Sequence, residues 1–222
     1  MPLEIEVLRD ADAVAERGAQ IVASAATASI AARDRFTLAV SGGRTPWAMF
    51  AALYGRLPWE KVTIFQADER IAPDGDPDRN LTQLKRSLPP GGAADVRAMP
   101  VWADDLEAAA AIYAAALPQR LGLVHLGLGP DGHTASLIPG DPVLDVSDRD
   151  VAVTGVYQGR RRMTLTYPVL NRARQILWLV TGDDKADALA RLRAGDLSIP
   201  AGRVSTANAL VVADEAAGGS TP

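Results

Sequence analysis

The segment Phe36-Thr37-Leu38-Ala39-Val40-Ser41-Gly42-Gly43-Arg44-Thr45-Pro46 contains a complete transition from strand to helix. Its first five residues are mostly apolar, as expected for a strand that is buried on both faces of a parallel sheet. Two glycines then permit a tight turn, and Thr45 followed by Pro46 matches the N-cap and first position of a helix. The segment therefore predicts a strand, a glycine turn and a helix that begins at Pro46.

The same alternation continues along the whole chain. The predicted strands are Ile5–Leu8, Phe36–Val40, Val62–Ala67, Leu123–Leu128, Val151–Val156, Met163–Thr166, Ile176–Val180 and Ala209–Ala213. The predicted helices are Ala11–Ala32, Pro46–Leu57, Asp105–Ala116 and Asp183–Ala194, with N-caps at Asp10 and Asp104 and a C-terminal cap at Gly195. This order predicts an α/β fold, in which a mostly parallel sheet is flanked by helices on both faces.

The breaks in this pattern are short. Segments rich in proline and glycine occur at Pro73–Pro77, Pro89–Gly92 and Pro139–Pro142, and the alternation of strands and helices continues across each of them. We therefore expect the 222 residues to form a single domain, 1–222.

The composition excludes several kinds of chemistry. The chain has no cysteine, which rules out disulfides and cysteine nucleophiles, and its two histidines argue against a histidine-rich metal centre. The net charge of −4 predicts binding to neither nucleic acid nor membrane surfaces. The first residues lack the pattern of a signal peptide, and no apolar run approaches the roughly 20 residues that span a bilayer. We therefore expect a cytoplasmic protein.

Ligand sites in parallel α/β sheets gather at the carboxyl ends of strands, and three loops there carry functional residue types. The first loop is Ser41–Thr45. Its glycines, together with the start of a helix, favour an anion such as phosphate, although an ordinary strand–helix turn has the same composition. The loop matches neither the GxGxxG fingerprint nor the Walker A motif, which disfavours a dinucleotide or a nucleoside triphosphate.

The second loop is Asp68-Glu69-Arg70, which follows the strand Val62–Ala67. A charge run of this kind can simply be a solvated turn. Its place at a strand end nevertheless predicts that Asp68 and Arg70 reach the same crevice as the first loop.

The third loop is Gly127–Ser136, in which Asp131 and His133 stand among glycines and hydroxyl residues. His133 is a candidate general base, because a neutral imidazole accepts a proton near neutral pH. A helical turn that begins at Thr134 would favour this neutral form through its dipole. The alternative is that His133 only caps the turn through hydrogen bonds.

Three further residues deserve separate predictions. His125 lies among apolar neighbours in a strand, and we expect it to be buried and hydrogen-bonded. Arg162 ends a run of three arginines, part of which should be solvent-exposed. Lys185 lies in the first turn of a predicted helix just after a strand, so it can contact an anion or simply pair with Asp183 or Asp184.

Taken together, these loops resemble the signature segments of the 6-phosphogluconolactonase family. The resemblance extends over Gly127–Gly140, Arg162–Thr166, Gly182 with Lys185, and Ile199–Ala201, in the family's order. It implies a NagB/RpiA/CoA-transferase-like fold and hydrolysis of 6-phosphoglucono-δ-lactone to 6-phosphogluconate in the oxidative pentose phosphate pathway. It implies no metal and no other cofactor, and the only partner implied is the sugar-phosphate lactone.

The resemblance also implies roles for individual residues. His133 would be the general base that activates water, with Asp131 as its partner in the motif. The substrate and its phosphate would be held by residues of all three loops and two later segments, namely Ser41, Gly42, Gly43, Arg44, Thr45, Asp68, Arg70, Arg162 and Lys185. The chain departs from the usual family pattern at Gly122, at His125 and at Arg79-Asn80-Leu81.

Three alternatives remain at this point. Ser41 could be a nucleophile with His133 as its base, but the first glycine of GxSxG is missing. A glucosamine-6-phosphate deaminase has similar loops, but the segment Ala135–Gly140 lacks the carboxylate that deaminases usually carry there. A sugar-phosphate-sensing domain of a transcription regulator is the third alternative, although the chain has no helix-turn-helix candidate.

Overall fold

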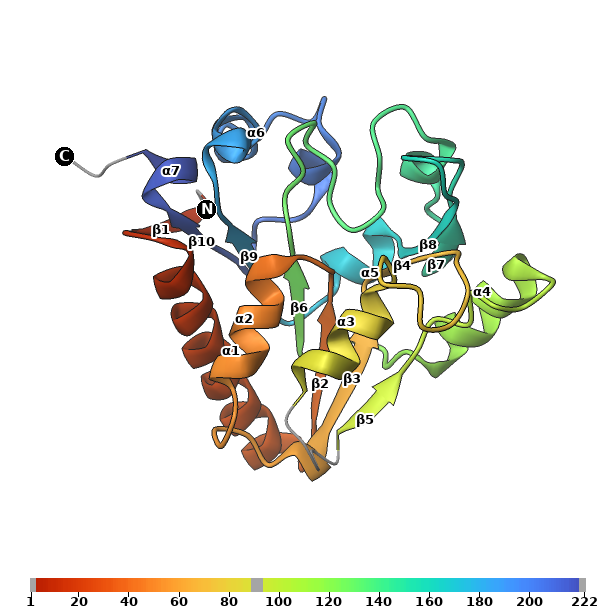
Figure 1. Cartoon of the computed structure of the whole chain (residues 1–222), viewed down its shortest axis with the longest axis horizontal. Helices are drawn as coiled ribbons and strands as arrows, with labels where there is room; N and C mark the ends of the chain where they lie inside the picture. Colours follow the sequence, from red (N-terminus) through yellow and green to blue (C-terminus); the bar gives the residue numbers. More distant parts are fainter. Residues whose placement is uncertain (1–2, 89–93, 220–222) are drawn as a thin grey trace.

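The centre of the fold is a parallel sheet of seven strands. The computed structural model describes residues 3–88 and 94–219. The strands follow the order β1-β10-β9-β6-β2-β3-β5, and every neighbouring pair is parallel (Figure 1). Their bounds are β1 Glu4–Leu8, β2 Phe36–Val40, β3 Val62–Gln66, β5 Asp95–Arg97, β6 Leu123–Leu126, β9 Ile176–Val180 and β10 Ala209–Asp214. The α/β prediction is confirmed.

Helices cover both faces of this sheet. One apolar cluster joins the sheet to α1 (Ala11–Arg33), α2 (Arg44–Ala52) and α3 (Asn80–Ser87). The other joins it to α4 (Leu106–Ala116), α5 (Tyr167–Asn171), α6 (Ala186–Arg193) and α7 (Glu215–Gly218). Single 3₁₀ turns lie at Trp59–Lys61, Pro142–Asp145, Asp183–Lys185 and Pro200–Arg203. None of the helices in the described ranges is long and apolar enough to cross a membrane.

A second, antiparallel sheet was not expected from the sequence. It consists of β4 (Asp68–Arg70), β8 (Arg162–Leu165) and β7 (Val151–Val153), in that order. The predicted loop Asp68-Glu69-Arg70 is therefore a strand. Ala67 joins the two sheets, because its N–H donates to Val40 O while its carbonyl accepts from Leu165 N.

Several predicted boundaries are corrected by the structure. The helix predicted from Pro46 begins at Arg44, and the strands predicted to end at Leu128 and Val156 end at Leu126 and Val153. Asp10 caps α1 as predicted, and Gly195 has the positive φ of a helix C-terminus. The predicted break Pro89–Gly92 lies outside the described residues. Four elements of the described residues, α3, α5, α7 and β5, were not predicted from the sequence.

The predicted N-cap of α4 is also one residue away from the true one. Asp105, not Asp104, caps this helix, because its Oδ1 accepts the N–H groups of Glu107 and Ala108 at 3.1 and 3.0 Å. Two adjacent aspartates offer the same capping group, and only the path of the chain selects between them.

His125 places a polar imidazole ring in the apolar core. It lies in β6 between Val40 and Leu177 of the neighbouring strands, and it is fully buried. Burial was predicted correctly, but the predicted hydrogen bond is wrong, since neither ring nitrogen has a partner among residues 3–88 and 94–219. Burial lowers the pKa of His125 to about 3, so the folded chain holds it as a neutral ring.

We expect His125→Leu to stabilise the protein at pH 7 by roughly 1–3 kcal/mol, because it removes unsatisfied polar atoms and keeps a similar volume. In the wild type, the unfolded chain binds a proton below pH ~6.5 that folded His125 rejects. Stability from this group is therefore complete above that pH and falls by about 1.4 kcal/mol per pH unit below it.

Urea unfolding of both proteins at pH 7.0, 6.0 and 5.0 measures this difference. The gap between variant and wild type should widen as the pH falls. Parallel pH profiles, or a less stable variant at pH 7, would contradict the account of His125.

Candidate active site

A cavity of about 490 Å³ opens at the carboxyl ends of the parallel strands. It brings together residues from all three loops and from two later segments that the sequence singled out. Those lining it are Ser41, Gly42, Gly43, Arg44, Thr45, Asp68, Arg70, His133, Arg162 and Lys185. Asp131 does not line the cavity and lies next to His133. Gln158 and Thr181 line the cavity as well, and no pattern in the sequence had selected them.

The glycine loop after β2 packs closely against the start of α3. A Cβ on Gly42 would lie 1.9 Å from Asn80 Oδ1, so only glycine allows α3 to approach this loop. Gly43 has a φ of 144° and is the N-cap residue of α2, which lets Arg44 enter the helix two residues earlier than predicted. The predicted cap at Thr45 is therefore wrong.

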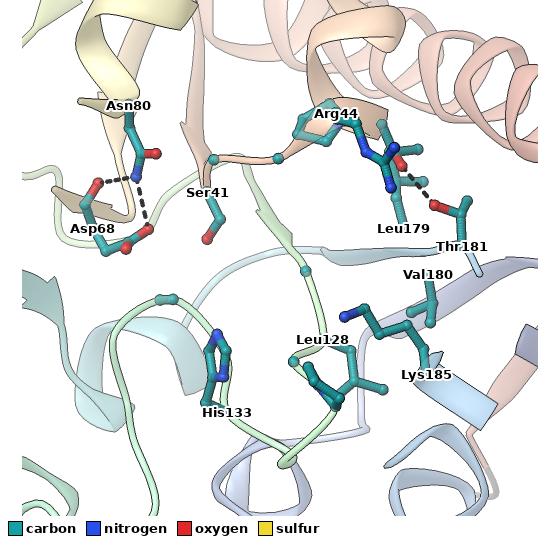
Figure 2. A pocket seen from close by; sticks show the side chains of 18 of the residues that line it. Ser41, Arg44, Asp68, Asn80, Leu128, His133, Leu179, Val180, Thr181 and Lys185 are labelled. Carbon is teal, nitrogen blue, oxygen red and sulfur yellow. Dashed lines mark hydrogen bonds between the residues drawn. The ribbon is translucent and has the colours of Figure 1, made fainter. Parts of the chain in front are cut away.

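The first turn of α2 forms one end of the cavity. No side chain caps its N–H groups, so these donors and the positive end of the helix dipole are open to a ligand. Thr45 Oγ1 lies 2.9 Å from Thr181 Oγ1, which ties this turn to the end of β9. In Figure 2, Arg44 and Lys185 lie on this side of the cavity, while Asp68, Asn80 and His133 lie on the other.

Lys185 has an acidic neighbour as well as a place in the cavity wall. Its Nζ lies 2.7 Å from Asp184 Oδ2, so the expected pairing with a neighbouring aspartate is present. The hydrogen bond from Lys185 lowers the pKa of the Asp184 carboxyl, and the charge of Arg44 contributes in the same direction. Two cations and an uncapped helix N-terminus thus make this end of the cavity positive.

The opposite end contains a buried carboxylate. Asp68 Oδ2 accepts the Ser136 hydroxyl at 2.7 Å, and Asn80 Nδ2 donates to Asp68 Oδ1 at 3.3 Å and to its carbonyl at 2.9 Å. These bonds hold a hydrogen-bond acceptor and an amide at the cavity wall. An anion would be repelled there, whereas hydroxyl groups would find both an acceptor and a donor.

Glu69, for which the sequence predicted no role of its own, holds this wall in place. The carboxylate is fully buried and accepts four hydrogen bonds of 2.8 Å, from Gln66 Nε2 and from the backbone N–H groups of Arg70, Asn80 and Leu81. The buried Arg79 guanidinium lies 3.5 Å away. Glu69 thereby caps α3 from β4 and fixes Asn80 beside Asp68.

Two arginines lie side by side on adjacent strands of the small antiparallel sheet. The register pairs Arg70 with Arg162, and both line the cavity. Arg70 Nη1 donates to Asp78 O, and Arg162 Nη2 donates to Gln158 Oε1 at 3.2 Å. Burial lowers the pKa of Arg162 and the charge of Asp68 opposes this effect. Like charges directly opposite each other are unfavourable, so this pair is suited to an anionic group between them.

His133 forms a close pair with Asp131. Its Nδ1 lies 2.5 Å from Asp131 Oδ1, and its backbone N–H donates to the same oxygen at 3.1 Å. An ionised carboxylate can only accept, so Nδ1 carries a proton, and in the neutral ring this tautomer leaves the lone pair on Nε2. Partial burial acts to raise the pKa of Asp131, but hydrogen bonds from His133 and Tyr157 lower it overall, which keeps the carboxylate ionised.

The helical turn predicted at Thr134 does not form. Leu137 N donates to Thr134 O at 2.9 Å and closes an antiparallel turn, and Ala135 has a left-handed φ of 48°. No helix dipole therefore acts on His133 from this segment, and Asp131 is its electrostatic partner instead.

Gly129 provides the space for the His133 ring. A Cβ at this position would lie 2.1 Å from Nδ1 and 2.2 Å from Cε1 of the ring, and 2.7 Å from Asp131 Oδ1. The glycine-rich loop thus serves the close approach of the imidazole to the backbone as well as the turn itself.

The described residues contain no group of three or more histidine, aspartate or glutamate side chains that could hold a metal ion. What these residues do offer is a histidine–aspartate pair on one wall and a positive end on the other. The fold and cavity define the class: an α/β protein with a polar, partly cationic ligand site at the carboxyl edge of its sheet.

Residues 9–212 match the family described as glucosamine-6-phosphate isomerases/6-phosphogluconolactonase, and the chain belongs to this family. A 6-phosphogluconolactonase of Synechocystis sp. is 36% identical over 209 residues, which cover 86% of this chain and 85% of that protein. One from Rhizobium meliloti is 36% identical over 206 residues, covering 87% and 89%.

Solved structures share the fold. A 6-phosphogluconolactonase from Shewanella baltica superposes with a TM-score of 0.87 at 24% identity, covering 96% of this chain and 97% of its own. A monomeric glucosamine-6-phosphate deaminase gives 0.84 at 19% identity, covering 97% and 98%. The fold is therefore common to both activities, and the site residues must distinguish them.

We expect Gly129→Ala to separate His133 from Asp131 without unfolding the chain. The ring would have to retreat by about 1.3 Å to reach ordinary contact at 3.4 Å. With only two histidines in the chain, ¹H–¹⁵N spectra of the imidazoles can follow the His133 Nδ1 proton, whose signal should lose the downfield shift of a short hydrogen bond.

Gly127→Ala is the matched control, because its Cβ meets nothing within 4 Å in the same loop. It should keep the downfield signal. An unchanged signal in Gly129→Ala would show that the loop absorbs the methyl group elsewhere.

Proposed function

We propose that this chain hydrolyses 6-phosphoglucono-δ-lactone to 6-phosphogluconate, in the oxidative pentose phosphate pathway. The observation that carries the proposal is the His133–Asp131 pair on one wall of a cavity whose other end is an uncapped helix N-terminus with Lys185 and Arg44. A substrate that carries an activated ester for the His133 wall and a phosphate for the positive end would match these two parts of the cavity. The names of the relatives, 6-phosphogluconolactonases at 33–36% identity over most of the chain, support it.

The phosphate would bind at the α2 end of the cavity. The N–H groups of the first helical turn supply donors, while Lys185 and Arg44 supply charge. Asp68 and Asn80 would face the sugar hydroxyls, because a carboxylate beside the phosphate would repel it. Arg70 and Arg162 add positive charge on the wall nearer the reacting carbonyl, where negative charge develops.

His133 would act as the general base for direct attack by water. Nε2 takes one proton from water as its oxygen bonds to the lactone carbonyl carbon, and the carbonyl oxygen becomes an oxyanion. The carbon–oxygen bond of the ring then breaks, and the imidazolium returns its proton to the departing ring oxygen. Asp131 keeps the proton of Nδ1 in place throughout and stabilises the imidazolium.

Competing reactions find less support in the geometry. Ser41 Oγ is buried and has no hydrogen-bond partner in the described part of the chain, so it lacks the activating base of a serine nucleophile. The turn that follows His133 supplies no carboxylate for a deaminase. Asp68 is the remaining acid in the cavity, and its two oxygens already accept hydrogen bonds from Ser136 and Asn80.

His133→Ala should lower kcat by roughly 10²–10⁴-fold and leave KM within a few-fold of the wild type, because the base acts mainly in the transition state. The measurement is a coupled assay with freshly generated 6-phosphoglucono-δ-lactone, corrected for spontaneous hydrolysis. A near-wild-type rate would remove His133 from the mechanism. Release of ammonia from glucosamine 6-phosphate by the wild type would instead support a deaminase.

Lys185→Met should raise KM by roughly 10–100-fold with a smaller change in kcat, since it removes a charge-assisted contact to the phosphate. The matched control is Asp184→Asn, which frees Lys185 from its acidic partner and should leave KM unchanged or lower. Equal increases in KM for the two variants would argue that the local structure, and not the Lys185 charge, matters for binding.

A further inference from the structure

A tyrosine lies behind the proposed base and outside the cavity lining. The Tyr157 hydroxyl donates to Asp131 Oδ2 at 3.0 Å, while Asp131 Oδ1 binds His133 Nδ1 at 2.5 Å. The two oxygens of one carboxylate therefore serve two different side chains. The Tyr157 and His133 rings also meet edge to face, with centroids 5.5 Å apart and an interplanar angle of 65°.

Tyr157 is itself held at a defined position. It opens the tight turn between β7 and β8, in which Tyr157 N donates to Arg160 O at 2.9 Å and Arg160 N donates back at 3.2 Å. The two central residues, Gln158 and Gly159, have the positive φ values of 50° and 78° typical of two-residue hairpin turns. The Arg162 guanidinium covers the other part of the ring, 4.9 Å from its centroid.

We propose that Tyr157 is a positioning residue for the reaction: its hydroxyl fixes the plane of the Asp131 carboxylate and thereby the tautomer and direction of His133. This inference rests on the proposed function, in which His133 is the base. Tyr157 is not among the residues that line the cavity, and its hydroxyl reaches His133 only through Asp131.

The physical need for such a residue follows from the loop that carries the pair. Asp131 lies in a glycine-rich turn and is about one third exposed, so its carboxylate has little packing to fix it. A hydrogen bond from a rigid hairpin removes that freedom without competing for the oxygen that binds His133. Burial and the hydrogen bond to Asp131 both raise the pKa of Tyr157, which keeps its hydroxyl protonated as a donor.

The Arg162 guanidinium links the hairpin turn of Tyr157 to the cavity. Arg162 lines the cavity and stacks on the Tyr157 ring, and its Nη2 also binds Gln158 in the same turn. The turn that positions the base is thus held by the same arginine that faces the substrate space. Replacing the hydroxyl alone leaves this stacking intact, which makes Tyr157→Phe a selective test.

Tyr157→Phe should lower kcat by roughly ten-fold and leave KM within about two-fold, because a hydrogen bond to a charged group is lost without loss of a substrate contact. Tyr167→Phe is the matched control, since that hydroxyl binds Pro200 O at 2.9 Å, away from Asp131. The control should keep the wild-type kcat. An unchanged kcat in Tyr157→Phe would overturn the inference.

A double-mutant cycle tests whether the effect passes through Asp131. In an Asp131→Asn background, Tyr157→Phe should cost less than two-fold, because the carboxylate that it orients is gone. Additive losses would mean that Tyr157 acts by another route and would overturn the proposal. If His133→Ala keeps full activity, the proposed base fails. If His133→Ala is inactive and Tyr157→Phe is not affected, only the positioning role fails.

Discussion

The reversal of strand order between β2 and β6 is the constraint on which the site depends. From β2 the chain adds β3 and β5 on one side, and from β6 it adds β9 and β10 on the other. Because all seven strands are parallel, the loops that leave β2 and β6 diverge to opposite faces and leave a crevice between them. The glycine loop and the His133 loop line this crevice, and residues more than 80 positions apart in the sequence meet there.

A second constraint is the buried Glu69 carboxylate. Four N–H donors surround it, which offsets the cost of removing a charge from water and joins β4, the end of β3 and the start of α3. Asn80 and Asp68 occupy the cavity wall because this unit holds them. The antiparallel sheet then carries Arg162 to the same crevice, so the wall formed by Asp68, Asn80 and Arg162 rests on structure outside the parallel sheet.

Much of the site could be predicted from local sequence. Apolar runs located every parallel strand except β5 to within two residues, and the turn residues after them identified the Ser41–Thr45 and Gly127–Ser136 loops. Local reasoning failed where two neighbours offered the same group, as at Asp104 and Asp105, and where a left-handed residue redirected the chain, as at Ala135. The strand Asp68–Arg70 was missed because three charged residues carry no apolar pattern, and their burial depends on partners elsewhere.

By itself, the sequence determined the alternation of strands and helices, the loops that carry functional residues and the candidate base, since each of these depends on residues close together along the chain. Only the tertiary structure decided the contacts of Tyr157 with Asp131 and of Thr45 with Thr181, which join residues 26 and 136 positions apart. It also decided that His125 has no partner. Such contacts depend on strand order and register. A periodic pattern in the sequence does not predict which side chains this order and register will bring within hydrogen-bonding distance.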